Sequence, residues 1–218
     1  MKLGDIKIEA LKIMFVNYNY EINIDTLDRL KNDENINSYL INMPGAINRC
    51  FSVIEEKRIL PTKRYDLKIE EIEKTIEQKG NLFYFNLDKL IDDYFDIERV
   101  VRVNENEYDG NVEYIMEGST LILPIEYFAE NSPAEFSVIY YPSINRIASN
   151  TSNEDEIDVP DKIATHIPYF IKGELYRDDE PNEANEARSW FEQAMAQIQA
   201  NNQRSFSKIK NVYSQMEM

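Results

Sequence analysis

Apolar residues near the start of the chain recur with the period of one helical face. Asp5 stands just before this pattern, where its carboxylate can cap a first helix, and Asp25 stands likewise before a second, shorter helix. The apolar positions of the two helices are Ile6, Ala10, Leu11, Ile13 and Met14, followed by Leu27 and Leu30. The pattern therefore predicts two N-terminal helices.

A third helical pattern covers residues 35 to 58. Its buried face is marked by Ile36, Leu40, Ile47, Phe51 and Ile54. Proline suits the first turn of a helix and distorts a helix interior, so Pro44-Gly45 predicts either a helix start or a kink at that point.

The middle of the chain, residues 62 to 146, has a different pattern. Runs rich in β-branched and aromatic residues alternate with turn-forming segments, and these runs are "NLFYF", "ERVVRV", "NVEYIM", "STLILPI" and "EFSVIYY". Asp109-Gly110 is a strong hairpin signal, and the alternation of Phe136, Val138 and Tyr140 predicts one buried face. The block is typical of an antiparallel β-sandwich or small barrel, in which "LDKLIDDYF" is a helical turn or a loop.

Two further apolar stripes predict a helical hairpin within residues 147 to 202. The stripes are Ile167, Phe170, Ile171 and Leu175, then Ala187, Trp190, Phe191, Ala194, Met195 and Ile198. We interpret Asp178-Asp179-Glu180-Pro181 between them as the corner, because Pro181 disfavours helical geometry before it and suits the next helix start. We expect Trp190 and Phe191 to fill the core, so that Trp190→Ala costs on the order of a few kcal/mol of stability.

Residues 203 to 218 form a cationic and apolar segment of their own. The basic residues are Arg204, Lys208 and Lys210, and the apolar residues are Phe206, Ile209, Val212, Tyr213 and Met216. The apolar residues are spaced like one helical face, but no domain remains to cover them. We predict an extended tail that orders on contact with a partner, with all of these residues as contacts.

These patterns together predict an α+β protein. N-terminal helices (residues 1–61) and the C-terminal helical hairpin (147–202) would form one helical domain. An antiparallel β domain (62–146) would be inserted into it, and an extended partner-binding tail (203–218) would follow.

Forty acidic residues against 24 basic ones give the chain a formal charge of −16 and an isoelectric point near 4.5. Lys and Arg carry most of a protein's affinity for phosphate backbones, so this charge disfavours a DNA-binding surface and anionic membranes. No run of about 18 apolar residues occurs, and the first residues lack the apolar core of a signal peptide. We therefore expect neither a membrane span nor a secretory leader.

The search for catalytic or metal-binding residues gives no complete set. His166 is the only histidine and Cys50 the only cysteine, which excludes a disulfide within the chain and leaves a zinc site without enough ligands. No Gly-x-Ser-x-Gly motif accompanies His166, and we expect it near a helix start. Read as a calcium loop from Asp178, the corner puts Glu183 and Ser189 where glycine and glutamate belong. We predict no catalysis, cofactor or metal.

The β block leaves one alternative function open. Its aromatic residues and the carboxylates Asp92 and Asp93 could form a carbohydrate-binding or glycan-processing module, since glycosidases place two carboxylates across a sugar bond. A hydrophobic core explains the same aromatic residues. A bacterial regulator without a role in a virion is a further alternative.

The hairpin "IPYFIKGELYRDDEPNEANEARSWFEQAM" resembles the C-terminal signature of head–tail connector (adaptor) proteins of tailed bacteriophages. In that family an Ile-Pro-Tyr entry leads to a Glu-Leu-Tyr helix, an acidic corner ending in proline, and an Ala/Arg-rich helix with an aromatic-Glu step. The matching residues are Ile167, Pro168, Tyr169, Gly173, Glu174, Leu175, Tyr176, Asp178, Asp179, Glu180, Pro181, Ala187, Arg188, Phe191 and Glu192. The segments "LGDIKIEALKIMF", "YDGNVEY" and "STLIL" are similar to members from low-GC hosts, whereas the large β block departs from the simplest all-helical adaptors.

This resemblance implies a structural virion protein without catalysis, synthesised in the host cytoplasm and located in the neck at the portal vertex. Copies would form a homo-oligomeric ring, commonly a dodecamer, that docks on the portal protein and contacts a tail-side neck or tail protein. Viral DNA would pass through the channel during ejection without specific binding. The C-terminal tail residues named above would reach the portal, and Arg188, Asp178 and Asp179 are candidate intersubunit contacts.

Overall fold

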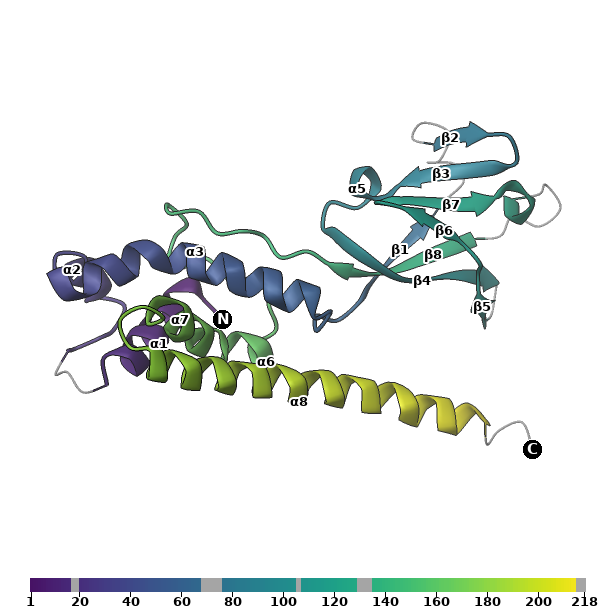
Figure 1. Ribbon diagram of the computed structural model, residues 1–218. Coiled ribbons are helices and arrows are strands. Elements are labelled where there is room, and N and C mark those ends of the chain that lie inside the picture. The colour runs from purple at the N-terminus through teal and green to yellow at the C-terminus, as the bar shows by residue number, and fades with distance from the viewer. Residues whose placement is uncertain (17–19, 68–75, 105–106, 129–134, 215–218) are drawn as a thin grey trace. The chain divides into compact units, whose positions relative to one another are not determined.

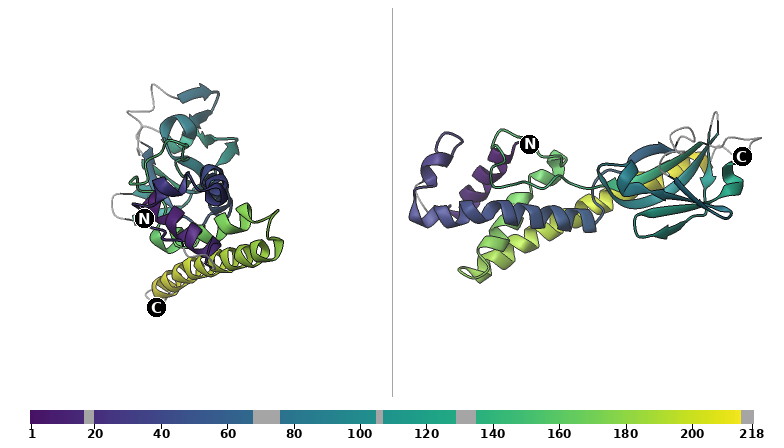
Figure 2. Two further views of the ribbon diagram at one scale, coloured as in Figure 1. Left: turned by 90° about the vertical axis from the view of Figure 1, so that its left-hand side faces the viewer. Right: turned by 90° about the horizontal axis from the view of Figure 1, so that it is seen from above.

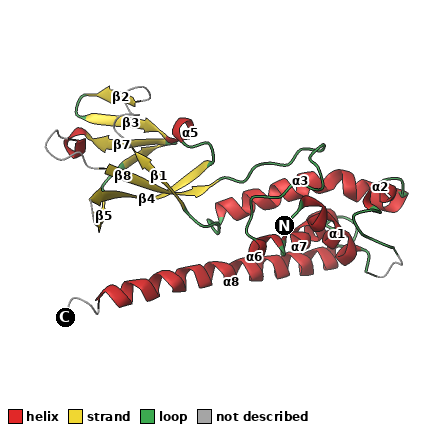
Figure 3. Ribbon diagram, turned by 180° about the vertical axis from the view of Figure 1, so that it is seen from behind, coloured by secondary structure: helices red, strands yellow, loops and turns green. Residues whose placement is uncertain are grey.

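The computed structural model describes residues 1–16, 20–67, 76–104, 107–128 and 135–214 of the chain. It is a mixed α+β structure that divides into two compact units (Figures 1 and 3). We call Met1–Ile59 with Asn145–Met218 the helical unit, and Leu60–Ile144 the β unit. The pattern of the sequence predicts this inserted domain at residues 62–146.

The N-terminal part of the helical unit contains helices α1 (Leu3–Met14), α2 (Leu27–Leu30) and α3 (Glu34–Glu56). The predicted caps are wrong in register. Lys2 is the N-cap residue of α1 and Asp5 the third helical residue, whose carboxylate accepts a hydrogen bond from the Lys2 N–H at 3.3 Å. Thr26, not Asp25, precedes α2.

Helix α3 continues through Pro44, so the helix start predicted there is wrong. An interior proline costs about 3 kcal/mol because it removes a backbone hydrogen bond. Met43 and Ile47, on either side of it, are fully buried, and burial of such side chains offsets this cost. The real start is capped by Asp33, whose carboxylate accepts a hydrogen bond from the Asn35 N–H at 2.9 Å.

The C-terminal part contains α6 (Asp161–Ala164), α7 (Ile167–Leu175) and α8 (Pro181–Ser214). Helix α7 packs against α1, α3 and α8, and the views in Figures 1 and 2 place it among them. The acidic segment before Pro181 forms the corner between α7 and α8.

Helix α8 extends to Ser214, so the extended conformation predicted for residues 203–214 is wrong for the backbone. The reason is visible in the sequence, because no proline or glycine follows Pro181. Met216 lies outside the described residues.

The β unit consists of two four-stranded antiparallel sheets, with strand orders β1-β8-β4-β5 and β2-β3-β7-β6. The strands are β1 (Lys63–Leu67), β2 (Ile76–Lys79), β3 (Leu82–Asn86), β4 (Tyr94–Asn104), β5 (Glu107–Asn111), β6 (Ile115–Glu117), β7 (Thr120–Pro124) and β8 (Glu135–Pro142). Helix α5 (Leu87–Leu90) follows β3, as the helical-turn prediction allows, and the 3-10 helix η1 (Ile125–Phe128) follows β7. The strands that the structure describes do not close into one barrel.

The hairpin predicted at Asp109-Gly110 is placed wrongly. Both residues lie inside β5, where Asp109 pairs with Arg102 of β4, and the pairing of the two strands extends to Asn104 and Glu107. The predicted "EGS" break is confirmed, since Gly118 turns the chain from β6 to β7 with a positive φ of 61°. Glycine adopts that backbone conformation without a steric penalty.

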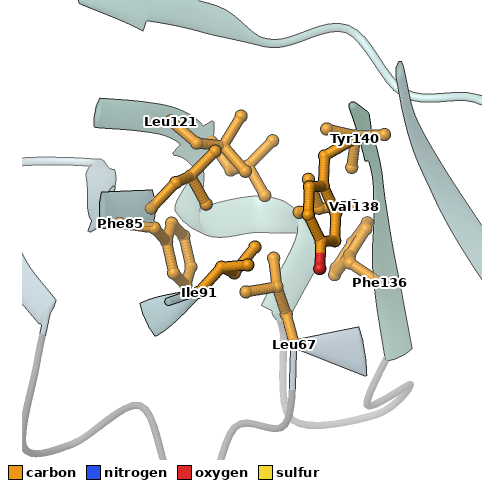
Figure 4. Close-up of a cluster of buried hydrophobic side chains, with 10 residues drawn as sticks. Leu67, Phe85, Ile91, Leu121, Phe136, Val138 and Tyr140 are labelled. Atoms are coloured by element: carbon orange, nitrogen blue, oxygen red, sulfur yellow. The ribbon is translucent and has the colours of Figure 1, made fainter. Parts of the chain in front are cut away.

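The two sheets and α5 contribute side chains to one hydrophobic core (Figure 4). Phe136, Val138 and Tyr140 of β8 are buried there, which confirms the predicted alternation. Phe85 and Leu121 enter the same core from the other sheet. Phe85, Phe136 and Tyr140 are therefore part of the interior of the β unit.

Candidate functional site

The acidic corner, Asp178 to Glu180, is held by bonds within the chain. The Glu180 N–H donates to the Tyr176 carbonyl at 2.8 Å, and the Glu180 carbonyl accepts from the Ala184 N–H at 2.9 Å. The Tyr39 hydroxyl of α3 donates to Asp179 Oδ2 at 3.0 Å, while the Asp178 side chain is 85 % exposed. The corner is thus a fixed turn that presents carboxylates to solvent.

Arg188, a predicted intersubunit contact, has a partner within the chain. Its guanidinium donates to Glu174 Oε1 at 2.7 Å, and the Arg49 Nε of α3 donates to Glu174 Oε2 at 2.9 Å. We call Arg49, Glu174 and Arg188 the Glu174 cluster. Because Glu174 is only 16 % exposed, these charge-assisted bonds tie α3, α7 and α8 together.

The hairpin is closely packed at Gly173. A Cβ atom placed on Gly173 would lie 2.5 Å from Arg188 Cγ and 3.2 Å from the Ala184 carbonyl oxygen. The missing side chain therefore lets α7 approach α8. On the other side of α7, the Lys172 ammonium donates to the Ile13 carbonyl at 3.1 Å, where a cation suits the C-terminal end of α1.

Trp190 is 57 % exposed and Phe191 is 1 % exposed, so the prediction that both fill the core is wrong for Trp190. The Phe191 ring packs edge-on against Phe170 at a centroid distance of 5.0 Å. Successive helical residues point about 100° apart, and with Phe191 packed on Phe170 of α7 the Trp190 side chain points toward solvent.

The predicted portal contacts lie on the last part of α8 or beyond it. The backbone of Arg204, Phe206, Lys208, Ile209, Lys210, Val212 and Tyr213 is helical, their side chains are not among those described, and Met216 lies outside the described residues. The last described side-chain contacts of α8 with the helical unit are made by Gln199 and Asn202. Gln199 donates to the Lys57 carbonyl at 3.4 Å, and Asn202 donates to the Ile59 carbonyl at 3.3 Å.

His166 and Cys50 occupy structural positions. His166 is the N-cap residue of α7, as predicted near a helix start, and burial lowers its pKa below the usual histidine value. Cys50 is fully buried in α3, and burial raises the pKa of its thiol well above the usual value. No group of three or more His, Cys, Asp or Glu side chains suited to a metal ion occurs among the described residues.

The two carboxylates of the alternative carbohydrate site differ in their surroundings. Asp92 is exposed, whereas Asp93 accepts hydrogen bonds from the Tyr140 hydroxyl at 2.8 Å and the Lys63 ammonium at 2.7 Å. Burial alone would raise the pKa of Asp93, but these two bonds outweigh it and hold that pKa below its usual value. Burial and the bond to Asp93 raise the pKa of Tyr140. The Tyr140 ring is 5 % exposed and belongs to the core, so it offers no stacking surface for a sugar.

Sequence reasoning missed the Glu174 cluster and a lysine-containing pocket between α1 and α3. Their members are far apart in the chain, and an isolated Arg or Lys carries no signal of its partner. The spacing of Glu174 and Arg188 across a hairpin corner could have suggested that pair.

No helix in the part of the chain that the structure describes combines the length and the apolar character of a membrane span. No family model and no curated protein matches the chain.

Proposed function

We propose that this chain is a structural head–tail adaptor of a tailed bacteriophage. Copies form a ring in the neck of the virion, dock on the portal protein, and extend the DNA channel toward a tail-side partner. The observation that carries the proposal is helix α8, which is bonded to the Lys57 and Ile59 carbonyls through Gln199 and Asn202 and continues as helix to Ser214. In this assignment the β unit is a sandwich-like insertion.

The anchored part of α8 provides a rigid base for a binding segment. The Glu174 cluster and the buried Phe191 hold its first half against α7 and α3. An ion pair of 2.7 Å between Lys57 and Glu192 adds a contact on the way to Asn202. A segment that leaves such a base as helix loses less conformational entropy on binding than a disordered one.

The last part of α8 has the sequence of a groove-binding helix. Positions 206, 209 and 213 carry Phe, Ile and Tyr at i, i+3 and i+7, the spacing of anchors that enter an apolar groove. Arg204, Lys208 and Lys210 add positive charge to this end of a chain whose net charge is −16. We therefore assign the portal contact to these residues, and expect the portal groove to be apolar with an acidic rim.

The net negative charge also fits a channel through which DNA passes. Proteins hold DNA mainly through Lys and Arg that neutralise phosphates. A ring with a large excess of carboxylates has little affinity for the moving duplex, so DNA passes it without specific binding.

The test is binding of the full-length chain to the portal protein encoded beside it, compared with a chain that lacks residues 203–218. We expect the deletion to abolish binding without unfolding the helical unit, because the Glu174 cluster and the buried Phe191 lie outside the deleted residues. Phe206→Ala with Ile209→Ala should weaken binding about tenfold or more, as loss of apolar anchors does, while Ser207→Ala serves as the matched control.

Two results would count against the proposal in different ways. Unchanged portal binding by the shortened chain removes the C-terminal assignment. Images of particles or of portal complexes that show no collar of this chain remove the adaptor function itself.

A further inference from the structure

A pocket of about 290 Å³ opens on the helical unit between α1, α3 and the segment 149–153. Leu40, Ile41 and Pro44 of α3 form its apolar side. Lys7 of α1 and Lys31, which follows α2, bring positive charge to the other side. Such a combination suits a carboxylate carried on a short side chain.

Lys7 is a half-buried cation in an acidic protein, and it is paired with no carboxylate among the described residues. Its ammonium donates to the neutral Asn153 Oδ1 at 2.8 Å. Lys31, in contrast, forms an ion pair of 2.6 Å with Asp28. Burial first, and then the charge of Lys31, lower the pKa of Lys7 below the usual lysine value. A buried charge is unfavourable until a counter-charge joins it, so the pocket would stabilise a carboxylate brought from outside.

The polar wall of the pocket is fixed before anything binds. The Gly4 N–H donates to the Asn153 carbonyl at 2.8 Å, and the Leu3 N–H donates to the Asp155 carbonyl at 2.9 Å. The Ala148 N–H donates to Thr151 Oγ1 at 2.8 Å. The first two bonds fasten the segment to the N-terminal end of α1, and the third fixes its own turn, so the site is preformed.

We infer that this pocket receives a carboxylate from the acidic corner, Asp178 to Glu180, of a second copy of the chain. The inference rests on the proposed function, because a ring of copies requires a repeated contact between two different surfaces. Beyond the proposed function, the inference names the two surfaces that meet. They are the pocket around Lys7 of one subunit and the α7–α8 corner of its neighbour.

The corner has the charge and position that this contact needs. All three of its acidic residues are exposed, and Asp178 has only the neighbouring Arg177 as an ion-pair partner, at 3.4 Å, among the described residues. Tyr39 holds the corner against one face of α3. At about 100° per residue, the pocket positions of α3 are centred about 150° around the helix from Tyr39. The acidic corner and the pocket therefore lie on nearly opposite sides of α3. Two complementary surfaces placed in this way give a heterologous contact, the kind that can close into a ring.

The test measures self-association of the full-length chain by sedimentation velocity, alone and in the presence of the portal protein. Lys7→Gln removes the charge of the pocket that has no carboxylate partner among the described residues, and Asp178→Asn with Asp179→Asn and Glu180→Gln neutralises the corner without removing the acceptor for Tyr39. Each variant should self-associate about tenfold or more weakly, since the contact loses its charge pair. Lys12→Gln, on the exposed side of the same helix, should assemble like the wild type, and circular dichroism checks that all variants fold.

Mixing the two variants gives a sharper result. Each retains one intact half of the contact, so an equimolar mixture should form one-to-one dimers that neither variant forms alone. Variants that assemble as well as the wild type, singly and on the portal, overturn the inference and leave the adaptor function standing. A wild-type chain that never places two copies together, free or on the portal, overturns both.

A second experiment tests whether the pocket binds a small free carboxylate instead of a carboxylate of the neighbouring subunit. Sodium acetate is titrated into the chain while the NMR signal of the Lys7 ammonium group is followed. We expect this signal to respond to self-association and only weakly to acetate. Saturation by acetate, without any response to the second copy, would show a small-molecule site and overturn the subunit contact.

Discussion

Glu174 joins three helices because one carboxylate accepts bonds from two guanidinium groups. Arg49 comes from α3 and Arg188 from α8, at 2.9 and 2.7 Å. Both arginines are partly exposed, at 57 % and 38 %, while Glu174 is the enclosed member. Arg188 therefore has a structural task within the chain, and its predicted intersubunit contact stays a prediction.

Glu174→Gln should lower the free energy of unfolding by about 1–3 kcal/mol, because hydrogen bonds to a charged acceptor are lost in a partly buried place. Glu9→Gln is the matched control, since Glu9 and its ion-pair partner Lys12, at 2.8 Å, are both about half exposed. An exposed pair of this kind contributes about 0–1 kcal/mol. Urea unfolding measures both variants, and equal losses would contradict the role of the cluster.

Helix α8 shows what hydrophobic periodicity predicts and what it leaves open. The pattern correctly places an apolar stripe against α7, with Ala184, Ala187, Phe191 and Met195 buried. The pattern does not exclude Trp190 from that stripe. Trp190 and Phe191 are adjacent apolar residues, and the helical spacing fits a buried face centred on either of them. Contact with α7 selects the register, and Trp190 is then left on the exposed face.

Phe191→Ala should therefore cost about 3–5 kcal/mol of stability, the usual loss for a buried aromatic residue, whereas Trp190→Ala should cost less than about 1 kcal/mol. Chemical unfolding of the two variants provides the comparison. Stability losses of equal size would mean that the Trp190 side chain is buried within the helical unit, as the Phe191 side chain is. If Trp190→Ala instead weakens assembly at unchanged stability, the exposed ring belongs to an interface.

The element boundaries that the sequence analysis misplaced have a common physical cause. The pairing of β4 with β5 extends to Asn104 and Glu107, and Asp109-Gly110 is then drawn into the paired part of β5. In the same way, Met43 and Ile47 are buried on both sides of Pro44 and keep α3 continuous. Local signals describe what a segment prefers, and tertiary pairing decides where it begins and ends.

For the whole molecule, the sequence indicates the inserted β unit because the spacing of its apolar residues changes. The spacing follows the helical period of 3.6 residues, then the strand period of 2 residues, and then the helical period again. Helical spacing ends before residue 60 and resumes after residue 160, while the strands lie between. The candidate sites were less predictable than this organisation. The Lys7 pocket draws on α1, α3 and the segment 149–153, and proximity between such distant residues exists only after folding.

The β unit should fold by itself when residues 60–144 are expressed alone. It has its own core from both sheets, including Phe85, Leu121 and Phe136, which are fully buried. Its first and last strands are neighbours, with Lys63 paired to Tyr140, so the two chain ends leave the unit side by side. A domain with these properties normally tolerates excision and insertion.

We expect the excised unit to give a dispersed NMR spectrum and one cooperative thermal transition by circular dichroism. The reciprocal chain, in which a short Gly-Ser linker replaces residues 63–142, should retain the helical unit, because Arg146 still pairs with Glu55 and Asn48 still exchanges two hydrogen bonds with Ile147. An excised β unit that stays unfolded would show that its core depends on the helical unit. Portal binding by the reciprocal chain would then establish whether the insertion takes part in docking, since α8 is unchanged in it.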